Sequence, residues 1–91
     1  MKYAFFKGEI VPFEDAKISI MTHAFNYGTG VFEGIRGYYN SDKKQMFILK
    51  LKEHYERLIR SCRVLKMKPR LSIEELCGTT LELVKKNGYR E

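Results

Sequence analysis

Short apolar runs fill the first half of the chain, and apolar residues at helical spacing fill the second half. Residues 4–13 are typical of two short strands joined at Lys7-Gly8, a hairpin-type turn. Residues 31–39 and 46–49 are typical of a second pair of strands, because aromatic and β-branched residues dominate both and a polar reversal separates them. The first half therefore predicts two antiparallel hairpins.

Two amphipathic helices are predicted in the second half. Apolar residues recur every three or four positions over residues 51–67, and a proline two residues later prevents the helix from continuing. The next helix begins at Ser72, because Ser72 and Glu75 have the spacing of a capping box. It ends at the pair Asn87 and Gly88, a normal C-terminal stop.

A glycine-rich stretch follows the first predicted hairpin and continues into the strand over residues 31–39, with four glycines within residues 28–37. Residues 27–30 are typical of a turn, since glycine adopts positive φ without steric cost. In the strand that follows, successive side chains point to opposite faces. The residues expected on one face are Phe32, Gly34, Arg36 and Tyr38, and those expected on the other are Val31, Glu33, Ile35 and Tyr39. Glycine inside a strand often marks the close approach of a ligand or another backbone, so the first face is a candidate binding surface.

Other interpretations of this stretch stay open. A twisted core strand with Arg36 at a surface edge would need no ligand. A dinucleotide-binding loop fits poorly, because Gly28, Gly30 and Gly34 miss the spacing of that motif by one and a strand follows where the motif needs a helix. His23 has no second histidine or carboxylate at metal-ligand spacing, so we interpret it as a hydrogen-bonded structural residue and predict no metal site.

The predicted elements indicate an α+β fold in which a small antiparallel sheet of hairpins carries two packed helices. Ninety-one residues make at most one modest domain, and 44% hydrophobic residues exclude a disordered segment. One face of the sheet has no predicted cover, so we expect a missing partner there and self-association of the isolated chain.

Positive charge is concentrated in one helix. The formal net charge is +6, and residues 50–70 alone carry the same balance. Glu53 and Arg57 have the spacing of a helical ion pair, whereas Arg60 and Arg63 are interpreted as solvated or structural. A nucleic-acid-binding module is the alternative that this charge suggests, although the aromatic residues lie on a separate strand instead of among the arginines.

The cysteines and the apolar runs limit the compartment. Cys62 and Cys77 are too few for a disulfide framework or a zinc site, and we interpret both as small core residues. No apolar run approaches the roughly 20 residues that cross a bilayer, and no signal-like region opens the chain. We therefore expect a cytoplasmic protein that does not contact a membrane.

Two motifs together resemble a known family. Residues 23–36 (H-A-F-N-Y-G-T-G-V-F-E-G-I-R) and 53–58 (E-H-Y-E-R-L) closely resemble the amino-terminal region of branched-chain amino-acid aminotransferases, pyridoxal-phosphate enzymes of fold type IV. Residues 6–9 and 14–17 match as well, so the similarity covers essentially the whole chain. The F-E-G-I-R string favours the branched-chain enzymes over D-amino-acid aminotransferases and aminodeoxychorismate lyases, which remain the alternatives.

The resemblance implies an enzyme that moves the amino group of leucine, isoleucine or valine to 2-oxoglutarate, with pyridoxal 5'-phosphate as cofactor. Arg57 matches the arginine that binds the cofactor phosphate in this family. Tyr27 and Phe32 match residues that line the apolar substrate pocket, the tyrosine usually coming from the neighbouring subunit of a homo-oligomer. Gly34 and Arg36 share the strand face of Phe32, so we expect them to line the same cavity.

The resemblance also implies a second domain. The family's Schiff-base lysine and the groups that contact the pyridine ring lie far downstream, and no lysine here has a similar context. We therefore interpret residues 1–91 as the small N-terminal domain of a D-amino-acid-aminotransferase-like fold, a fragment without the C-terminal domain. On this interpretation the fragment supplies no catalytic residue, does not bind the cofactor on its own and is inactive.

Overall fold

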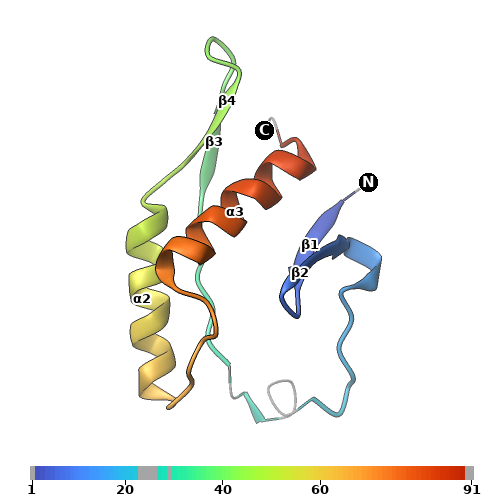
Figure 1. Ribbon diagram of the computed structural model, residues 1–91, viewed down its shortest axis with the longest axis vertical. Helices are drawn as coiled ribbons and strands as arrows, with labels where there is room; N and C mark the ends of the chain where they lie inside the picture. The colour runs from blue at the N-terminus through green and yellow to red at the C-terminus, as the bar shows by residue number, and fades with distance from the viewer. Residues whose placement is uncertain (1, 23–26, 29, 90–91) are drawn as a thin grey trace.

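The computed structural model describes residues 2–22, 27–28 and 30–89. In chain order its elements are the strands β1 (Tyr3–Phe6) and β2 (Glu9–Pro12), the 3-10 helix η1 (Phe13–Asp15), the strands β3 (Gly37–Asn40) and β4 (Gln45–Ile48), and the helices α2 (Leu51–Val64) and α3 (Ile73–Asn87). Helix α3 packs against both α2 and β1, and the β3–β4 hairpin extends beyond the end of α2 (Figure 1). The molecule measures 45 × 29 × 19 Å.

Both predicted hairpins are confirmed, and so is the α+β class. β1 pairs with β2 and β3 pairs with β4, each antiparallel. The two hairpins form separate two-stranded sheets, whereas the sequence analysis placed them in one sheet. Helix α3 lies between the hairpins, so their strand edges do not meet (Figure 1).

The strand expected over residues 31–39 is shorter in the structure, where β3 begins at Gly37. Its partner β4 ends at Ile48, and α2 begins three residues later, so no further residues are left to pair with residues 30–35. The hairpin's hydrogen bonds therefore end with the one from Leu49 N–H to the Arg36 carbonyl, 2.8 Å long. Residues 30–36 form no strand ladder.

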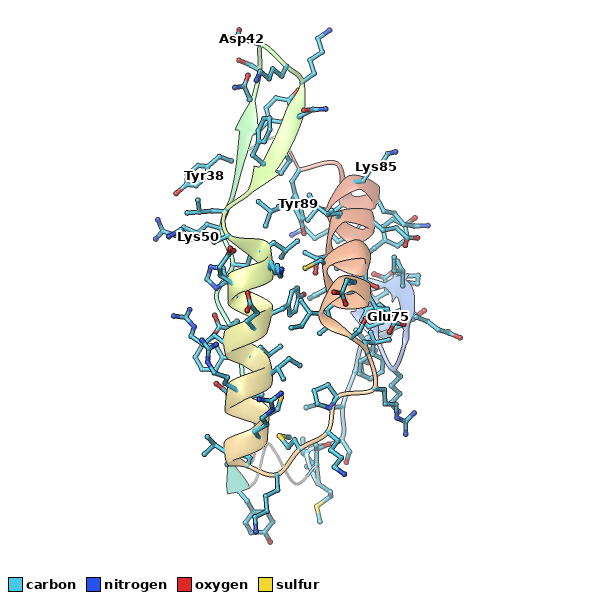
Figure 2. The ribbon with its side chains drawn as sticks, turned by 60° about the vertical axis from the view of Figure 1, so that its left-hand side comes forward. Tyr38, Asp42, Lys50, Glu75, Lys85 and Tyr89 are labelled. Atoms are coloured by element: carbon cyan, nitrogen blue, oxygen red, sulfur yellow. The ribbon has the colours of Figure 1, made fainter. Side chains whose placement is uncertain are left out.

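The alternation of faces predicted for residues 31–39 is nevertheless confirmed. Val31, Glu33, Ile35 and Tyr39 are half-buried, and Phe32, Gly34, Arg36 and Tyr38 are exposed. Figure 2 shows Tyr38 on the side of the hairpin away from α3. An extended backbone keeps the period of two even where no neighbouring strand pairs with it.

The helix ends follow from local hydrogen bonding. Ser72 Oγ accepts from the Glu75 N–H and the Glu75 carboxylate accepts from the Ser72 N–H, both at 3.1 Å, which confirms the capping box. Gly88, with φ of +64°, ends α3 as predicted. Helix α2 ends at Val64, before the expected position, because Lys66 adopts φ of +57° and closes a left-handed C-terminal motif.

The two helices are joined by a small interior. Cys62 is 6% exposed and is the one buried apolar residue among those described, which confirms its predicted core position; Cys77 is half-buried. The Tyr55 hydroxyl bonds to Thr80 Oγ1. Thr80 donates its own proton to the Leu76 carbonyl at 2.8 Å, so Tyr55 is the donor across the interface. Neither helix in the described part of the chain is long and apolar enough to span a membrane.

Asn87 connects the last turn of α3 to the first strand. Its Oδ1 accepts from the Tyr3 N–H at 2.8 Å, and its Nδ2 donates to the Tyr3 carbonyl at 3.1 Å. The amide therefore pairs with Tyr3 as a neighbouring strand would. Lys86 adds a contact with the Tyr3 ring, 4.6 Å from its centroid.

Replacing Asn87 with alanine should lower the free energy of unfolding by about 1–3 kcal/mol, because both backbone groups of Tyr3 lose their partner in a part-buried position. Urea unfolding followed by circular dichroism measures the loss. Asn40→Ala is the matched control, since the Asn40 side chain also forms two hydrogen bonds with the backbone, here accepting both, but only within its own exposed turn. If Asn87→Ala lowers the free energy of unfolding no more than Asn40→Ala does, the hydrogen bonds between Asn87 and Tyr3 do not stabilise the contact between α3 and β1.

Candidate functional site

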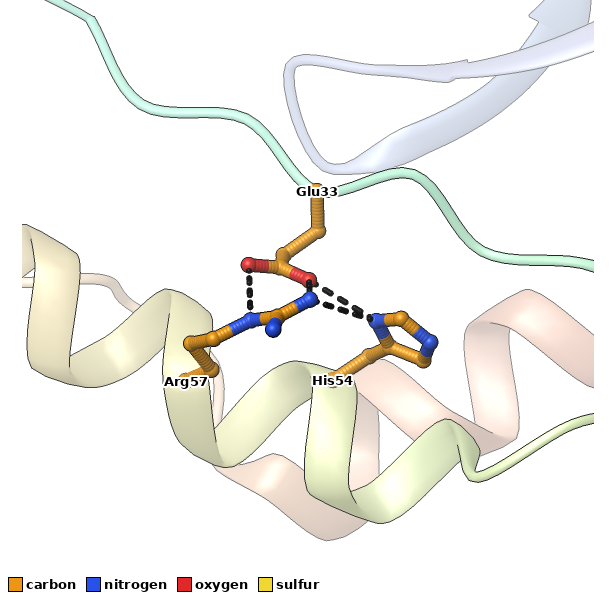
Figure 3. A network of polar contacts seen from close by, with 3 residues as sticks. All are labelled: Glu33, His54 and Arg57. Carbon is orange, nitrogen blue, oxygen red and sulfur yellow. Dashed lines mark hydrogen bonds and ion pairs between the residues drawn. The ribbon is translucent and has the colours of Figure 1, made fainter.

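The Glu33 carboxylate lies at the centre of a polar cluster (Figure 3). Its Oε2 accepts from Arg57 Nε at 2.8 Å, and its Oε1 accepts from Arg57 Nη2 at 2.6 Å and from His54 Nδ1 at 2.8 Å. The Glu33 side chain is only 9% exposed. A carboxylate so far removed from water requires partners of this kind, because an unpaired buried charge is strongly unfavourable.

Two local patterns bring these three residues together. The alternation along residues 30–36 turns Glu33 inward, toward α2. His54 and Arg57 are three residues apart in α2, a spacing that places them on the same side of a helix. The cluster thus joins a glycine-rich extended segment to the helix that carries most of the positive charge.

The hydrogen bonds determine the form of the histidine ring. An ionised Glu33 only accepts hydrogen bonds, so His54 Nδ1 must carry a proton to bond with it. The contact between His54 Nδ1 and Arg57 Nη2, at 3.4 Å, then joins two donors and adds no hydrogen bond. Both donors are therefore held by the same carboxylate oxygen.

The cluster fixes the charge of Glu33. The hydrogen bonds from Arg57, followed by that from His54, lower the pKa of Glu33 from 4.5 to about 2. The same carboxylate raises the pKa of Arg57. Glu33 is consequently an anion and Arg57 a cation throughout the neutral range.

A pocket of about 220 Å³ runs along α2 beside the cluster, and its lining residues are Lys50, Glu53, His54, Arg57 and Arg60. Three of these are cations and one is an acid. Arg57 directs one edge of its guanidinium at Glu33, and its other three N–H bonds have no acceptor among the residues the structure describes. This donor set can hold a phosphate-sized anion, since a guanidinium presents a rigid fork of donors to phosphate oxygens.

The structure corrects the expected pairing within α2. Arg57 bonds to Glu33 and forms no ion pair with Glu53 in the described part of the chain. A surface pair within one helix is worth little, whereas Glu33 offers a carboxylate that is shielded from water. The sequence analysis gave no role to Glu33 or His54. The pattern did place Glu33 on the face opposite to Phe32, and His54 lies three residues before Arg57 in the predicted helix.

Three of the predicted substrate residues, Phe32, Gly34 and Arg36, face outward from the extended segment, on the side opposite to Glu33. Phe32 is 90% exposed, and Tyr27, which precedes the segment, is 73% exposed. Arg57 therefore reaches residues 30–36 from the face opposite to Phe32. The structural role expected for His23 lies outside the described residues.

Gly34 and Gly37 differ in what surrounds them. A Cβ at Gly37 would lie 3.0 Å from Ile48 Cδ1 and Met46 Sδ, so the hairpin itself leaves no room for a side chain. A Cβ at Gly34 would meet no atom of the described chain within 4 Å, and its φ is not positive. The packing of the described residues therefore gives no reason for a glycine at position 34. Any need for glycine there would have to come from a group outside the described residues.

Comparison with known proteins gives one consistent result. The family model described as amino-transferase class IV matches residues 30–91. A probable branched-chain-amino-acid aminotransferase of Aquifex aeolicus is 54% identical over 91 residues, which are 100% of this chain and 29% of that relative.

Solved structures agree with the sequence matches. The branched-chain aminotransferase of Thermoproteus uzoniensis with norvaline has a TM-score of 0.91 at 36% identity, covering 99% of this chain and 30% of that one. The branched-chain amino acid aminotransferase of Thermobaculum terrenum in its PLP form has a TM-score of 0.88 at 36% identity, covering 98% of this chain and 29% of that one. The chain thus spans about three tenths of the length of these relatives.

Stability should depend on pH through Glu33. Because folding lowers the pKa of Glu33 from 4.5 to about 2, the ionised group stabilises the fold fully above pH 4.5, and this contribution is lost as the pH falls toward 2. Glu33→Gln should therefore be less stable than the wild type at pH 7, and the difference should shrink between pH 4.5 and 2. Urea unfolding at several pH values measures it, with the exposed Glu82→Gln as control. A difference independent of pH would show that Glu33 is not held as an anion.

Proposed function

The chain belongs to the class IV aminotransferases, and from this premise we propose that it forms the amino-terminal part of a branched-chain amino-acid aminotransferase. The enzyme would transfer the amino group of leucine, isoleucine or valine to 2-oxoglutarate, with pyridoxal 5'-phosphate as cofactor. The observation that carries the proposal is the presence of Arg57, fixed by Glu33, in a pocket that suits a phosphate. The Thermobaculum terrenum relative, which was solved in its PLP form, supports it.

The donor set fits the phosphate end of the cofactor. Arg57 would hold the phosphate with its remaining N–H bonds, and Lys50 and Arg60 would add positive charge along the same pocket. When bound, pyridoxal phosphate serves as an electron sink for the α-carbon of an amino acid. The described residues would anchor the phosphate and supply no acid or base, in keeping with the interpretation of this chain as one domain of the enzyme.

The outward face of residues 30–36 would form one wall of the substrate pocket. Phe32 offers an exposed ring, and Gly34 leaves a gap beside it that the chain's own packing does not require. Such a wall selects by apolar burial, at about 1–3 kcal/mol per methylene, which suits leucine, isoleucine and valine as a group. Arg36 adds a cation at the edge of this wall.

Self-association forms part of the proposal. Large apolar side chains remain in water, among them Phe32 at 90%, Val64 at 80% and Met21 at 78% exposed. We take these exposed apolar side chains as candidates for an interface, where a partner would remove them from water. We infer a homo-oligomer in which Tyr27 of one subunit lines the substrate pocket of its neighbour.

The full-length protein should convert L-valine and L-leucine with 2-oxoglutarate and leave D-alanine unchanged; coupled assays of the 2-oxo acid products measure this. Arg57→Ala should raise the dissociation constant for pyridoxal phosphate about 10- to 100-fold, because charged hydrogen bonds to the phosphate are lost. Arg63→Ala, on the same helix but outside the pocket, should leave it unchanged. Activity on the D-substrate alone would replace the proposal with the D-amino-acid aminotransferase, and equal effects of the two arginine variants would exclude Arg57 as the anchor.

Gly34→Ala separates a pocket role from a packing role. Its methyl group meets nothing in the described chain, so the free energy of unfolding should change by less than about 1 kcal/mol. In the full-length enzyme the methyl group would narrow the substrate pocket, and kcat/KM for leucine should fall about tenfold or more, since overpacking costs roughly 1–3 kcal/mol. Unchanged kinetics would place Gly34 outside the pocket.

A further inference from the structure

We propose that Glu33 is a positioning residue that aims the Arg57 guanidinium at the phosphate and, through the same backbone segment, holds the substrate wall in place. The inference rests on the proposed function and extends it to a residue that would touch neither cofactor nor substrate. Three observations support it: Glu33 bonds to the Nε–Nη2 edge of the Arg57 guanidinium, Glu33 is far less exposed than Arg57, and Glu33 lies between Phe32 and Gly34 in the chain.

The engaged edge determines where Arg57 can bind an anion. Nε and Nη2 both bond to Glu33, so Nη1 lies on the side of the guanidinium away from the carboxylate (Figure 3). Of the five N–H bonds of an arginine, two are engaged and three remain. An unrestrained arginine has many rotamers to lose on binding, and one already fixed by two hydrogen bonds loses fewer.

Burial shows which partner holds the other. The Glu33 side chain is 9% exposed and that of Arg57 is 59% exposed, so the carboxylate is the fixed member of the pair. His54, 19% exposed, also donates to this carboxylate, at Oε1. Arg57 is therefore positioned by Glu33, and Glu33 by His54 and by its own segment.

The order of residues couples the phosphate anchor to the substrate wall. Glu33 stands between Phe32 and Gly34 in an extended backbone, so turning Glu33 toward α2 turns both neighbours outward. The hydrogen bonds of the β3–β4 hairpin end at Arg36, so residues 30–35 have no strand neighbour. The hydrogen bonds of Glu33 to α2 thus replace a strand partner in setting the position of this segment.

Comparing pyridoxal 5'-phosphate with pyridoxal, which lacks the phosphate, tests the inference on the full-length protein. The wild type should bind the phosphorylated form far more tightly, and Glu33→Gln should reduce this preference about tenfold, the scale on which outer partners of a binding residue act. Absorbance titrations give both dissociation constants. Glu82→Gln, which neutralises an exposed carboxylate on α3, should keep the wild-type preference.

Each outcome assigns the failure to one idea. A wild type without preference for the phosphorylated form would overturn the proposed function. A wild-type preference that Glu33→Gln retains, with both ligands weakened equally, would overturn the positioning role alone and leave Glu33 as a structural residue. A stronger preference in Glu33→Gln would also overturn it, since Glu33 would then compete with the phosphate for Arg57. If Glu33→Gln does not fold, Glu33→Asp, which keeps the charge and withdraws it by one methylene, should show the same loss of preference.

Discussion

A carboxylate removed from water must be paired, and this requirement organises the part of the molecule that concerns function. Glu33 meets it with three hydrogen bonds from α2, and in doing so it fixes an arginine and a histidine. The same bonds attach an extended segment that has no strand neighbour. One half-buried and fully paired carboxylate therefore sets the geometry of the basic pocket on one side and of the aromatic and glycine surface on the other.

The rest of the fold holds together with little interior. Cys62 alone among the described apolar residues is buried, and many large apolar side chains lie in water. Directed hydrogen bonds compensate in part, as between Tyr55 and Thr80 and between Asn87 and Tyr3. Much apolar surface thus stays exposed in a small chain, and the Aquifex aeolicus relative is more than three times as long.

The sequence predicted what depends on local chemistry. The Ser72 capping box, the glycine that ends α3 and the alternation of faces around Phe32 follow from neighbouring residues, and the structure confirms them. The Glu33 cluster could not be predicted, because Glu33 is 21 residues from His54 and 24 residues from Arg57. Side-chain periodicity and secondary-structure propensity do not indicate which helix packs against a given face of an extended segment. For the same reason the helical pair of Glu53 and Arg57 was a reasonable expectation and wrong. The resemblance predicted Arg57 as a phosphate-binding residue and the structure gives it a basic pocket, but its role, like those of Tyr27, Phe32, Gly34 and Arg36, stays a prediction.

The hydrogen bonds between Asn87 and Tyr3 affect how the chain can fold while it is being synthesised. These residues are 84 positions apart, so on the ribosome the first strand waits for nearly all of the described chain before its anchor exists. At about 5–20 residues per second this delay is roughly 4–17 s. During that interval the β1–β2 hairpin has an open edge and no helix against it, a state in which isolated hairpins are marginally stable and prone to pair with other chains. The β1–β2 hairpin therefore lacks the partner of Tyr3 until Asn87 has been made.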